Sequence, residues 1–160
     1  MANGLKLEVA LPEDLPAWLA LFHFWLDMKV RLYETDANGH MSQLTFFGYQ
    51  EWASCEYWTH IGHPELMGSQ AETSLFMGEQ YCRFLAEVPY GKPLRLGVRC
   101  ARIGRSSVTL EYAFCRFDER LAAIGLNTQV LVNTATHRPV PLPDDYRAAI
   151  QRQDQASFLT

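Results

Sequence analysis

The chain has 160 residues, of which 48% are hydrophobic, 20% charged and 12% aromatic. This length and composition predict one globular domain with a single hydrophobic core, and they exclude a disordered chain. With 14 Lys and Arg against 18 Asp and Glu, the formal net charge is −4. Because proteins that neutralise nucleic-acid phosphates carry a basic excess, we expect no nucleic-acid partner.

The cysteines and the longest apolar run indicate the cellular compartment. Four cysteines stand at positions 55, 82, 100 and 115 without a Cys-x-x-Cys pair, which predicts buried reduced thiols rather than disulfides or a zinc site. The apolar run from Leu15 to Leu26 contains Pro16 and His23. It is shorter than the roughly 20 apolar residues of a membrane span. We therefore expect an uncleaved cytoplasmic protein without a membrane span or a bound metal.

The first predicted elements are a short helix and a strand. The acidic, proline-containing start at residues 12–14 predicts a helix over about 13–22. Apolar and polar residues then alternate over 26–33, which is the period-two pattern of a strand with one buried face. The aromatic-rich first 25 residues are too apolar for a free tail, so we expect them to pack on the sheet or on a neighbouring subunit.

A long helix comes next. After turn residues over 34–40, Ser42 is the predicted N-cap of a helix over about 43–61. Apolar side chains point in nearly every direction around this helix, which predicts burial on most sides. Such a helix needs other elements to wrap around it.

The rest of the chain has the pattern of strands joined by short turns. The predicted strands cover 73–86, 93–102, 107–116 and 121–133, and a terminal helix covers 144–152. One antiparallel sheet curled around one helix satisfies this order. Because that sheet covers only one side of the helix, its free edges favour pairing with a second copy.

The turn before the long helix carries the clearest candidate chemistry. The first N–H groups of a helix have no intrahelical acceptors, and they stabilise a carbonyl oxygen that becomes an oxyanion. Asp36, just upstream, supplies a carboxylate as a nucleophile or as a general base. This combination suits acyl transfer or hydrolysis. The same residue also fits an Asx turn, in which its role is structural.

Several separated motifs occur in order along the chain. Residues 30–40 read Val-Arg-Leu-Tyr-Glu-Thr-Asp-Ala-Asn-Gly-His, and they are followed by Phe46, Tyr49, Glu51 and Ala53. Further motifs lie at 90–94, 103–107 and 138–143. Together they resemble the hotdog-fold acyl-CoA thioesterases over about residues 27–150. The branch they resemble is the 4-hydroxybenzoyl-CoA thioesterase-like group, which includes the thioesterase of the Tol–Pal gene cluster.

The resemblance implies an α+β hotdog fold. In this fold a five-stranded antiparallel sheet wraps around the helix at 43–61, here with an extra N-terminal segment. The implied divisions are an extension over 1–25 packed on the domain, a hotdog domain over 26–152 and a C-terminal tail over 153–160. The resemblance also implies a homodimer or homotetramer with active sites at the subunit interface.

The resemblance further implies the catalytic residues. Asp36 matches the catalytic aspartate, and the backbone N–H of Gln43 matches the group that polarises the thioester carbonyl. Gly39 would allow close approach of the acyl group, although a turn explains it equally well. His40 would either contact substrate or orient the turn. Glu51 is a secondary candidate for a catalytic carboxylate.

The remaining candidates are expected to bind substrate. Phe46 and Tyr49 would contact the acyl group, although an aromatic-rich buried helix also suits a plain core. Arg105 and Arg138 match arginines that contact the phosphates of coenzyme A, with a solvated surface arginine as the alternative. Ser107 would hydrogen-bond the pantetheine arm.

The predicted function is hydrolysis of an acyl-CoA to a carboxylic acid and free CoA, with no cofactor beyond the CoA of the substrate. Two alternatives stay open. One is a thioesterase acting on acyl groups held by an acyl carrier protein, and the other is a non-catalytic acyl-CoA-binding module.

Overall fold

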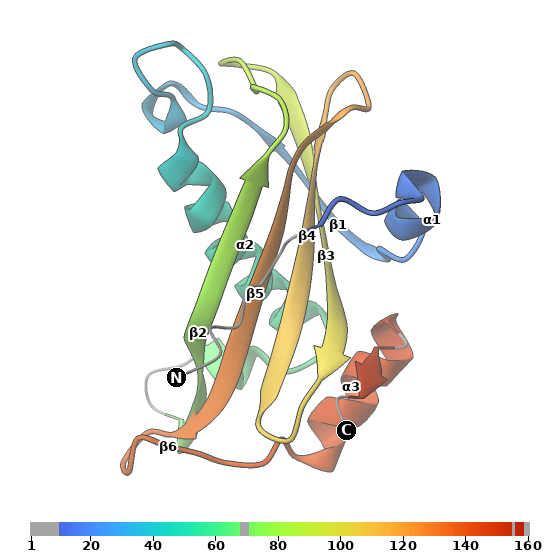
Figure 1. Ribbon diagram of the computed structural model, residues 1–160. Helices are drawn as coiled ribbons and strands as arrows, with labels where there is room; N and C mark the ends of the chain where they lie inside the picture. The colour runs from blue at the N-terminus through green and yellow to red at the C-terminus, as the bar shows by residue number, and fades with distance from the viewer. Residues whose placement is uncertain (1–9, 68–70, 155, 159–160) are drawn as a thin grey trace, which may run out of the picture.

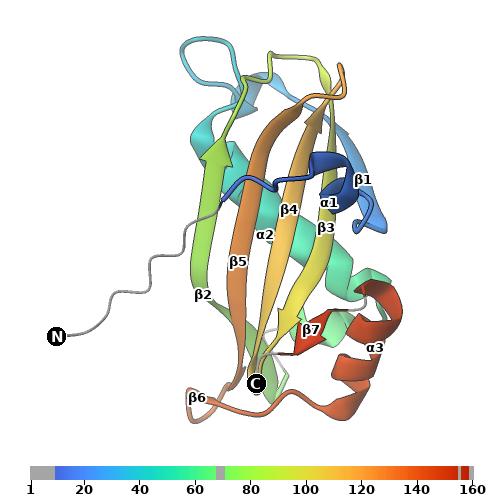
Figure 2. The same ribbon diagram turned by 45° about the vertical axis from the view of Figure 1, so that its right-hand side comes forward.

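The computed structural model describes residues 10–67, 71–154 and 156–158. Its main feature is an antiparallel sheet of five long strands in the order β1-β3-β4-β5-β2 (Figures 1 and 2). These strands are β1 (Phe24–Lys29), β2 (Thr73–Phe84), β3 (Pro93–Ile103), β4 (Ser107–Arg116) and β5 (Leu121–Asn133). Two short strands extend the sheet: β6 (Arg138–Pro139) pairs with β5, and β7 (Ser157–Phe158) pairs with β3. The predicted five-stranded antiparallel sheet is confirmed.

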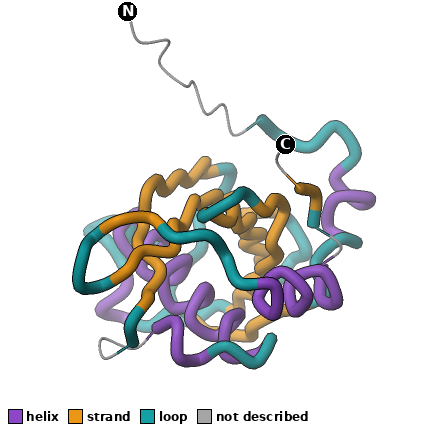
Figure 3. The backbone as a smooth tube through the Cα atoms, turned by 90° about the horizontal axis from the view of Figure 1, so that it is seen from below, coloured by secondary structure: helices purple, strands orange, loops and turns teal. Residues whose placement is uncertain are grey.

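The long helix α2 (Gln43–His60) lies on the inner face of this sheet, which curves partway around it (Figure 3). The helix begins where predicted because the Ser42 side chain accepts a hydrogen bond from the backbone N–H of Thr45. Its sheet-facing residues Ala53, Tyr57 and Trp58 are fully buried. They form one hydrophobic core with the inner faces of β3, β4 and β5, so the predicted sheet wrapped around one buried helix is confirmed.

The N-terminal segment crosses the outer face of the sheet, opposite α2 (Figure 2). It contains the short helix α1 (Leu15–Leu19), and the Trp18 indole N–H donates to Glu111 of β4 at 3.1 Å. Phe22 is buried against β3 at Gly97, where a Cβ atom would lie 2.9 Å from the rings of Phe22 and Trp25. A residue without a side chain is therefore needed there. Residues 1–9 of the predicted extension lie outside the described residues.

The first strand differs from its prediction at both ends. It covers Phe24–Lys29 instead of 26–33, and a 3-10 turn η1 (Leu32–Glu34) follows it. The alternating pattern fails after Val30 because the Glu34 side chain accepts the backbone N–H of Arg31 at 2.7 Å, which bends the chain. The turn points the chain towards the start of α2.

The C-terminal helix α3 (Asp144–Asp154) packs beside β3 and runs two residues beyond its prediction. Its last residue is fixed in the core, because one Asp154 carboxylate oxygen accepts the Tyr57 hydroxyl at 2.6 Å and the backbone N–H of Cys100 at 2.7 Å. Burial raises the pKa of the Asp154 carboxyl above its ordinary value, although these hydrogen bonds oppose the shift. The second short 3-10 turn, η2 (Pro64–Met67), connects α2 to the segment before β2.

Strand β2 lies at one edge of the sheet. It pairs with β5 on one side, and no other strand in the described part of the chain pairs with it. A bulge between Met77 and Glu79 bends it near Gly78. Large hydrophobic side chains are exposed along it: Phe76, Met77, Tyr81 and Phe84. A bent, apolar, unpaired edge is the surface on which a second copy can add its own strand.

Candidate functional site

Asp36 lies in a closed loop between η1 and α2. One carboxylate oxygen, Oδ1, accepts the backbone N–H of Asn38 at 2.8 Å and that of His40 at 3.4 Å. The Asp36 N–H donates to the His40 carbonyl at 2.8 Å, and Gly39 closes the turn with φ +77°. Asp36 therefore forms an Asx turn, the structural role that its sequence context allows. Its side chain is exposed, and no described residue donates to Oδ2, so this oxygen can reach a ligand.

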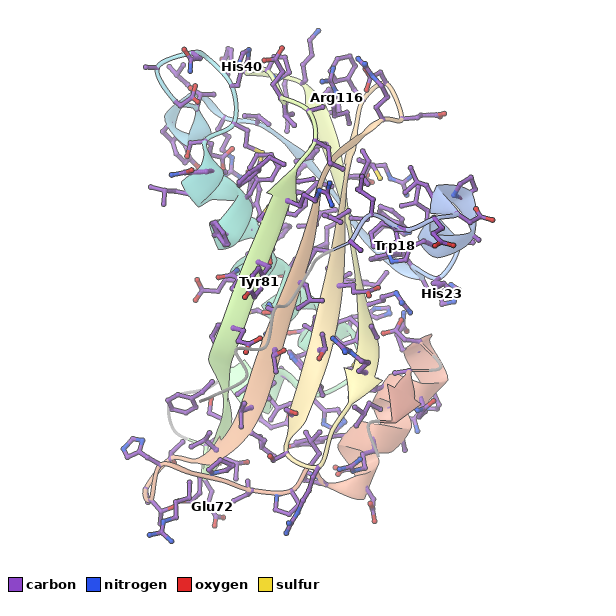
Figure 4. The ribbon with its side chains drawn as sticks, in the orientation of Figure 1. Trp18, His23, His40, Glu72, Tyr81 and Arg116 are labelled. Atoms are coloured by element: carbon purple, nitrogen blue, oxygen red, sulfur yellow. The ribbon has the colours of Figure 1, made fainter. Side chains whose placement is uncertain are left out.

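The same loop is docked on the segment that precedes β3. Met41 donates its N–H to the Val88 carbonyl at 2.8 Å, and the His40 Nδ1 lies 3.2 Å from Glu87 Oε2. Arg116 donates to the Glu87 carbonyl from β4. His40 and Arg116 accordingly lie at the same end of the sheet in Figure 4. The His40 side chain thus contacts Glu87, and whether it orients the loop or contacts substrate stays a prediction.

The loop that carries Asp36 leads into the N-terminus of α2. An antiparallel bridge between Thr35 and Met41 closes the loop, with Asp36 opposite His40 and with Glu34 bonded to the N-cap residue Ser42. Gln43 is exposed, and helix geometry leaves its backbone N–H without an intrahelical acceptor. The exposed Asp36 carboxylate and a helix N–H without an intrahelical acceptor therefore lie at one end of the molecule, and their catalytic roles stay predictions.

Glu34 lies at the base of the Asp36 loop, and the sequence did not single it out. Its carboxylate is buried, and it accepts the Tyr49 hydroxyl at 2.6 Å in addition to the N–H of Arg31. Its carbonyl oxygen accepts the Ser42 N–H and the Thr45 hydroxyl, both at 2.9 Å. Burial, followed by the hydrogen bond to Glu34, raises the pKa of the Tyr49 phenol. The sequence around Glu34 does not indicate that its side chain is buried. The burial arises from contacts with α2, which is a separate element.

Two cavities flank α2. An open groove of about 990 Å³ lies between β1, η1 and α2, and its lining includes Glu34, Tyr49 and Trp52. A smaller slot of about 240 Å³ lies between α2 and β2, and its lining includes Glu51 and Ser54. Tyr49 and Glu51 thus face opposite sides of the helix. Phe46 lines neither cavity: it is 3% exposed and packs edge-to-face on Phe114, so it is a core residue and not a binding surface.

The three residues expected to bind CoA lie far from Asp36 in the chain fold. Arg105 lies in the β3–β4 turn, Ser107 begins β4, and Arg138 lies in β6. These segments lie at the lower end of the sheet in Figure 1, whereas the Asp36 loop lies at the upper end. Arg105 and Arg138 are exposed and Ser107 is partly buried. One chain therefore does not bring the two halves of the predicted site together.

Three further features of the described residues concern the cysteines, metal binding and membrane-spanning helices. All four cysteines are free thiols, with Cys100 buried and the other three partly buried. Among residues 10–67, 71–154 and 156–158, no cluster of three or more His, Cys, Asp or Glu could hold a metal ion. No described helix combines the length and apolar character needed to cross a membrane.

Related proteins were found by sequence and by structure. The protein YsmA of Bacillus subtilis (strain 168), itself uncharacterised, is 26% identical over 146 residues, which cover 91% of this chain and 97% of YsmA. The crystal structure of PA5185 from Pseudomonas aeruginosa PAO1 has a TM-score of 0.75 and 27% identity, covering 86% of this chain and 96% of that one. The protein SAV2348 of Staphylococcus aureus, solved in complex with CoA, has a TM-score of 0.77 and 16% identity, covering 86% and 87%.

The family assignment comes from the sequence itself. Residues 30–150 match the profile of the thioesterase-like superfamily, and this range contains the Asp36 loop, α2 and the long strands β2 to β5. The match confirms the predicted resemblance to hotdog thioesterases and the predicted enzyme class, a thioester hydrolase. It does not single out the Tol–Pal branch, which stays a prediction. The chain belongs to the thioesterase-like superfamily.

Proposed function

We propose that this protein is an acyl-CoA thioesterase that hydrolyses acyl-S-CoA and water to a carboxylic acid and free CoA. The observation that carries the proposal is the exposed Asp36 carboxylate in a loop closed against the N-terminus of α2. A thioester carbonyl that accepts the Gln43 N–H lies within the field of the helix dipole, which stabilises the developing oxyanion. The CoA bound to SAV2348, a protein of the same fold, supports CoA as the carrier of the acyl group.

Asp36 acts at the carbonyl carbon of the thioester. As a nucleophile, its free oxygen forms an acyl-aspartyl anhydride and expels the CoA thiolate, which takes a proton from solvent. Water then hydrolyses the anhydride. As a general base, the carboxylate takes a proton from the water that attacks the carbonyl, and the tetrahedral intermediate expels the same thiolate. Both routes need the oxyanion stabilised at the helix N-terminus.

A dimer would complete the site. A two-fold axis that pairs the β2 edges antiparallel sets the Arg105 end of one copy beside the Asp36 end of the other. The exposed apolar side chains of β2 and its unpaired edge support this arrangement. Arg105 and Arg138 would then contact CoA phosphates, and Ser107 the pantetheine arm, across the interface. The four free thiols support a reducing, cytoplasmic location.

The test is free-thiol release from a panel of short, long and aromatic acyl-CoAs. We expect turnover on at least one member, which also names the acyl class. Tight acyl-CoA binding without thiol release would overturn the proposal in favour of a binding module.

The choice between CoA and a carrier protein has its own test. Arg105→Ala is expected to slow hydrolysis of CoA thioesters more than that of acyl-carrier-protein thioesters, because only CoA carries the phosphates at its nucleotide end. An equal loss on both substrates, or none, would contradict CoA as the carrier.

A further inference from the structure

Glu34, which is buried, and Tyr49, which is half-buried, form a hydrogen-bonded pair that the proposed chemistry does not use directly. The Glu34 side chain is 8% exposed, and its Oε1 lies 2.6 Å from the Tyr49 hydroxyl. Its Oε2 accepts the backbone N–H of Arg31 at 2.7 Å. Burying a carboxylate is costly unless its oxygens are hydrogen-bonded, and here each oxygen has a donor.

The main chain of Glu34 is bound to the same helix. Its carbonyl oxygen accepts the N–H of Ser42, the N-cap of α2, and the hydroxyl of Thr45. Tyr49 lies one turn further along α2 than Thr45. Residue 34 is therefore attached to the first two turns of α2 through both its main chain and its side chain.

These bonds hold the chain two residues before Asp36. The far side of the Asp36 loop is held separately, by the bond from the Met41 N–H to the Val88 carbonyl. The loop is thus fixed on one side by Glu34 and on the other by the segment before β3. Loss of the Glu34 bonds would release the side nearer to Asp36.

We propose that Glu34 and Tyr49 are positioning residues of the thioesterase site, whose hydrogen bond fixes the Asp36 carboxylate relative to the first N–H groups of α2. This inference rests on the proposed function. A misplacement of about 1 Å in a reacting group can cost about 10²-fold in rate. The raised pKa of the Tyr49 phenol supports the role, because the hydroxyl stays protonated and donates throughout the neutral range.

The chain offers a matched control on the same helix. Tyr57 donates its hydroxyl to Asp154 at 2.6 Å, the distance that also separates Tyr49 from Glu34. Tyr57 is eight residues further along α2, and its partner belongs to α3 rather than to the Asp36 loop. Replacing either tyrosine by phenylalanine therefore removes one tyrosine–carboxylate bond, but only one of these bonds leads to Asp36.

The experiment compares Tyr49→Phe, Tyr57→Phe and wild type in steady-state hydrolysis of the best acyl-CoA, with thermal unfolding as a measure of folding. We expect Tyr49→Phe to lower kcat by about 10- to 100-fold with KM nearly unchanged. Tyr57→Phe keeps kcat within about twofold, whatever its effect on stability. Equal kcat values in the two variants would overturn the proposal, because the bond would then have only a structural role.

Two further variants keep the test decisive. Glu34→Ala combined with Tyr49→Phe is expected to lower kcat no further than Glu34→Ala alone, because alanine already removes the carboxylate that accepts the Tyr49 hydroxyl. Should Tyr49→Phe not fold, Thr45→Val removes the other side-chain bond to residue 34 and is expected to lower kcat with KM nearly unchanged. A Thr45→Val protein with the kcat of wild type would then overturn the proposal.

Failure of the proposed function would be visible separately. If wild type hydrolyses no thioester, the positioning role is measured by amide hydrogen exchange over residues 36–41. Faster exchange in Tyr49→Phe but not in Tyr57→Phe supports the role of the pair in holding the loop. Equal exchange in both variants overturns it.

Discussion

Two acidic residues close together in sequence have opposite environments. Glu34 is buried with a hydrogen-bond donor on each carboxylate oxygen, whereas Asp36 is exposed, and only one of its carboxylate oxygens has a donor among the described residues. The sequence predicts the candidate role of Asp36, because a known motif surrounds it. It does not predict the role of Glu34, since its burial depends on contacts with Ser42, Thr45 and Tyr49 of another element.

At Gly125, the need for a residue without a side chain is visible only in the structure. A Cβ atom there would lie 2.7 Å from the side chain of Gln50, which is fully buried and donates to the Tyr81 carbonyl of β2. Gly125 therefore makes room for a polar contact between α2 and the edge strand. In the sequence it is one glycine within an otherwise ordinary strand pattern.

We expect Gly125→Ala to lower the free energy of unfolding by about 1–3 kcal/mol, because the added methyl group displaces Gln50. Gly48→Ala is the matched control. No atom lies within 4 Å of the Cβ position at Gly48, which is in the interior of α2. There alanine is expected to raise the free energy of unfolding by about 0.5–1 kcal/mol. Denaturant titration measures both, and a Gly125→Ala protein as stable as wild type would contradict the packing described.

Among the elements, the long helix and the four later strands are predictable, whereas the first strand is predicted only in part. The prediction of α2 is strong because its apolar side chains and the N-cap residue Ser42 indicate the same helix. The apolar and polar residues alternate over 26–33, beyond the end of β1, because the 3-10 turn η1 also contains apolar residues. Leu32, expected on a buried face, is 70% exposed. The hydrogen bond from the Arg31 N–H to the Glu34 side chain bends the chain just beyond the end of the strand at Lys29.

We expect the docking of α3 to depend on pH through Asp154. Burial raises the pKa of this carboxyl above 3.8, so the folded state binds its proton more tightly than the unfolded state does. Its contribution to stability is therefore present at low pH and is lost as pH rises through the raised folded pKa. Tyr57 and Cys100 can still donate to Asp154 after it ionises.

We expect wild type to lose stability relative to Asp154→Asn as pH rises from about 4 to about 7. The measurement is the free energy of unfolding of both proteins by denaturant titration across that range. The asparagine does not titrate, so the difference between the two proteins isolates this carboxyl. A difference that is constant, or that changes in the opposite direction, would contradict the assignment.

At the scale of the whole molecule, the sequence predicts the sheet wrapped around a helix but not where the two halves of the site lie. The Asp36 loop and the turn that carries Arg105 are at opposite ends of the sheet (Figure 1). Motif spacing along the chain gives no distance between those ends. Glu72, in the segment bonded to the β5–β6 turn, marks the end away from His40 in Figure 4. We therefore expect a complete site to require a second copy of the chain.

We expect wild type to be a dimer or a larger assembly, and Met77→Glu to dissociate it to a monomer of 18.3 kDa. Met77 is 43% exposed on the β2 edge, and a charge buried there would be left unpaired. Leu32→Glu, at a residue 70% exposed near the opposite edge, is the control and should keep the wild-type mass. Light scattering after size exclusion measures the masses. A monomeric wild type with full turnover would contradict the two-chain site.

The most direct measurement is free-thiol release from the best acyl-CoA by wild type and by Asp36→Asn. Asparagine keeps the oxygen that accepts the Asn38 N–H, so the turn and the fold are expected to survive. It supplies neither a nucleophilic carboxylate nor a general base, so we expect kcat to fall by about 10²- to 10⁴-fold. A folded Asp36→Asn protein that releases thiol as fast as wild type would contradict the central claim and leave Asp36 a turn residue.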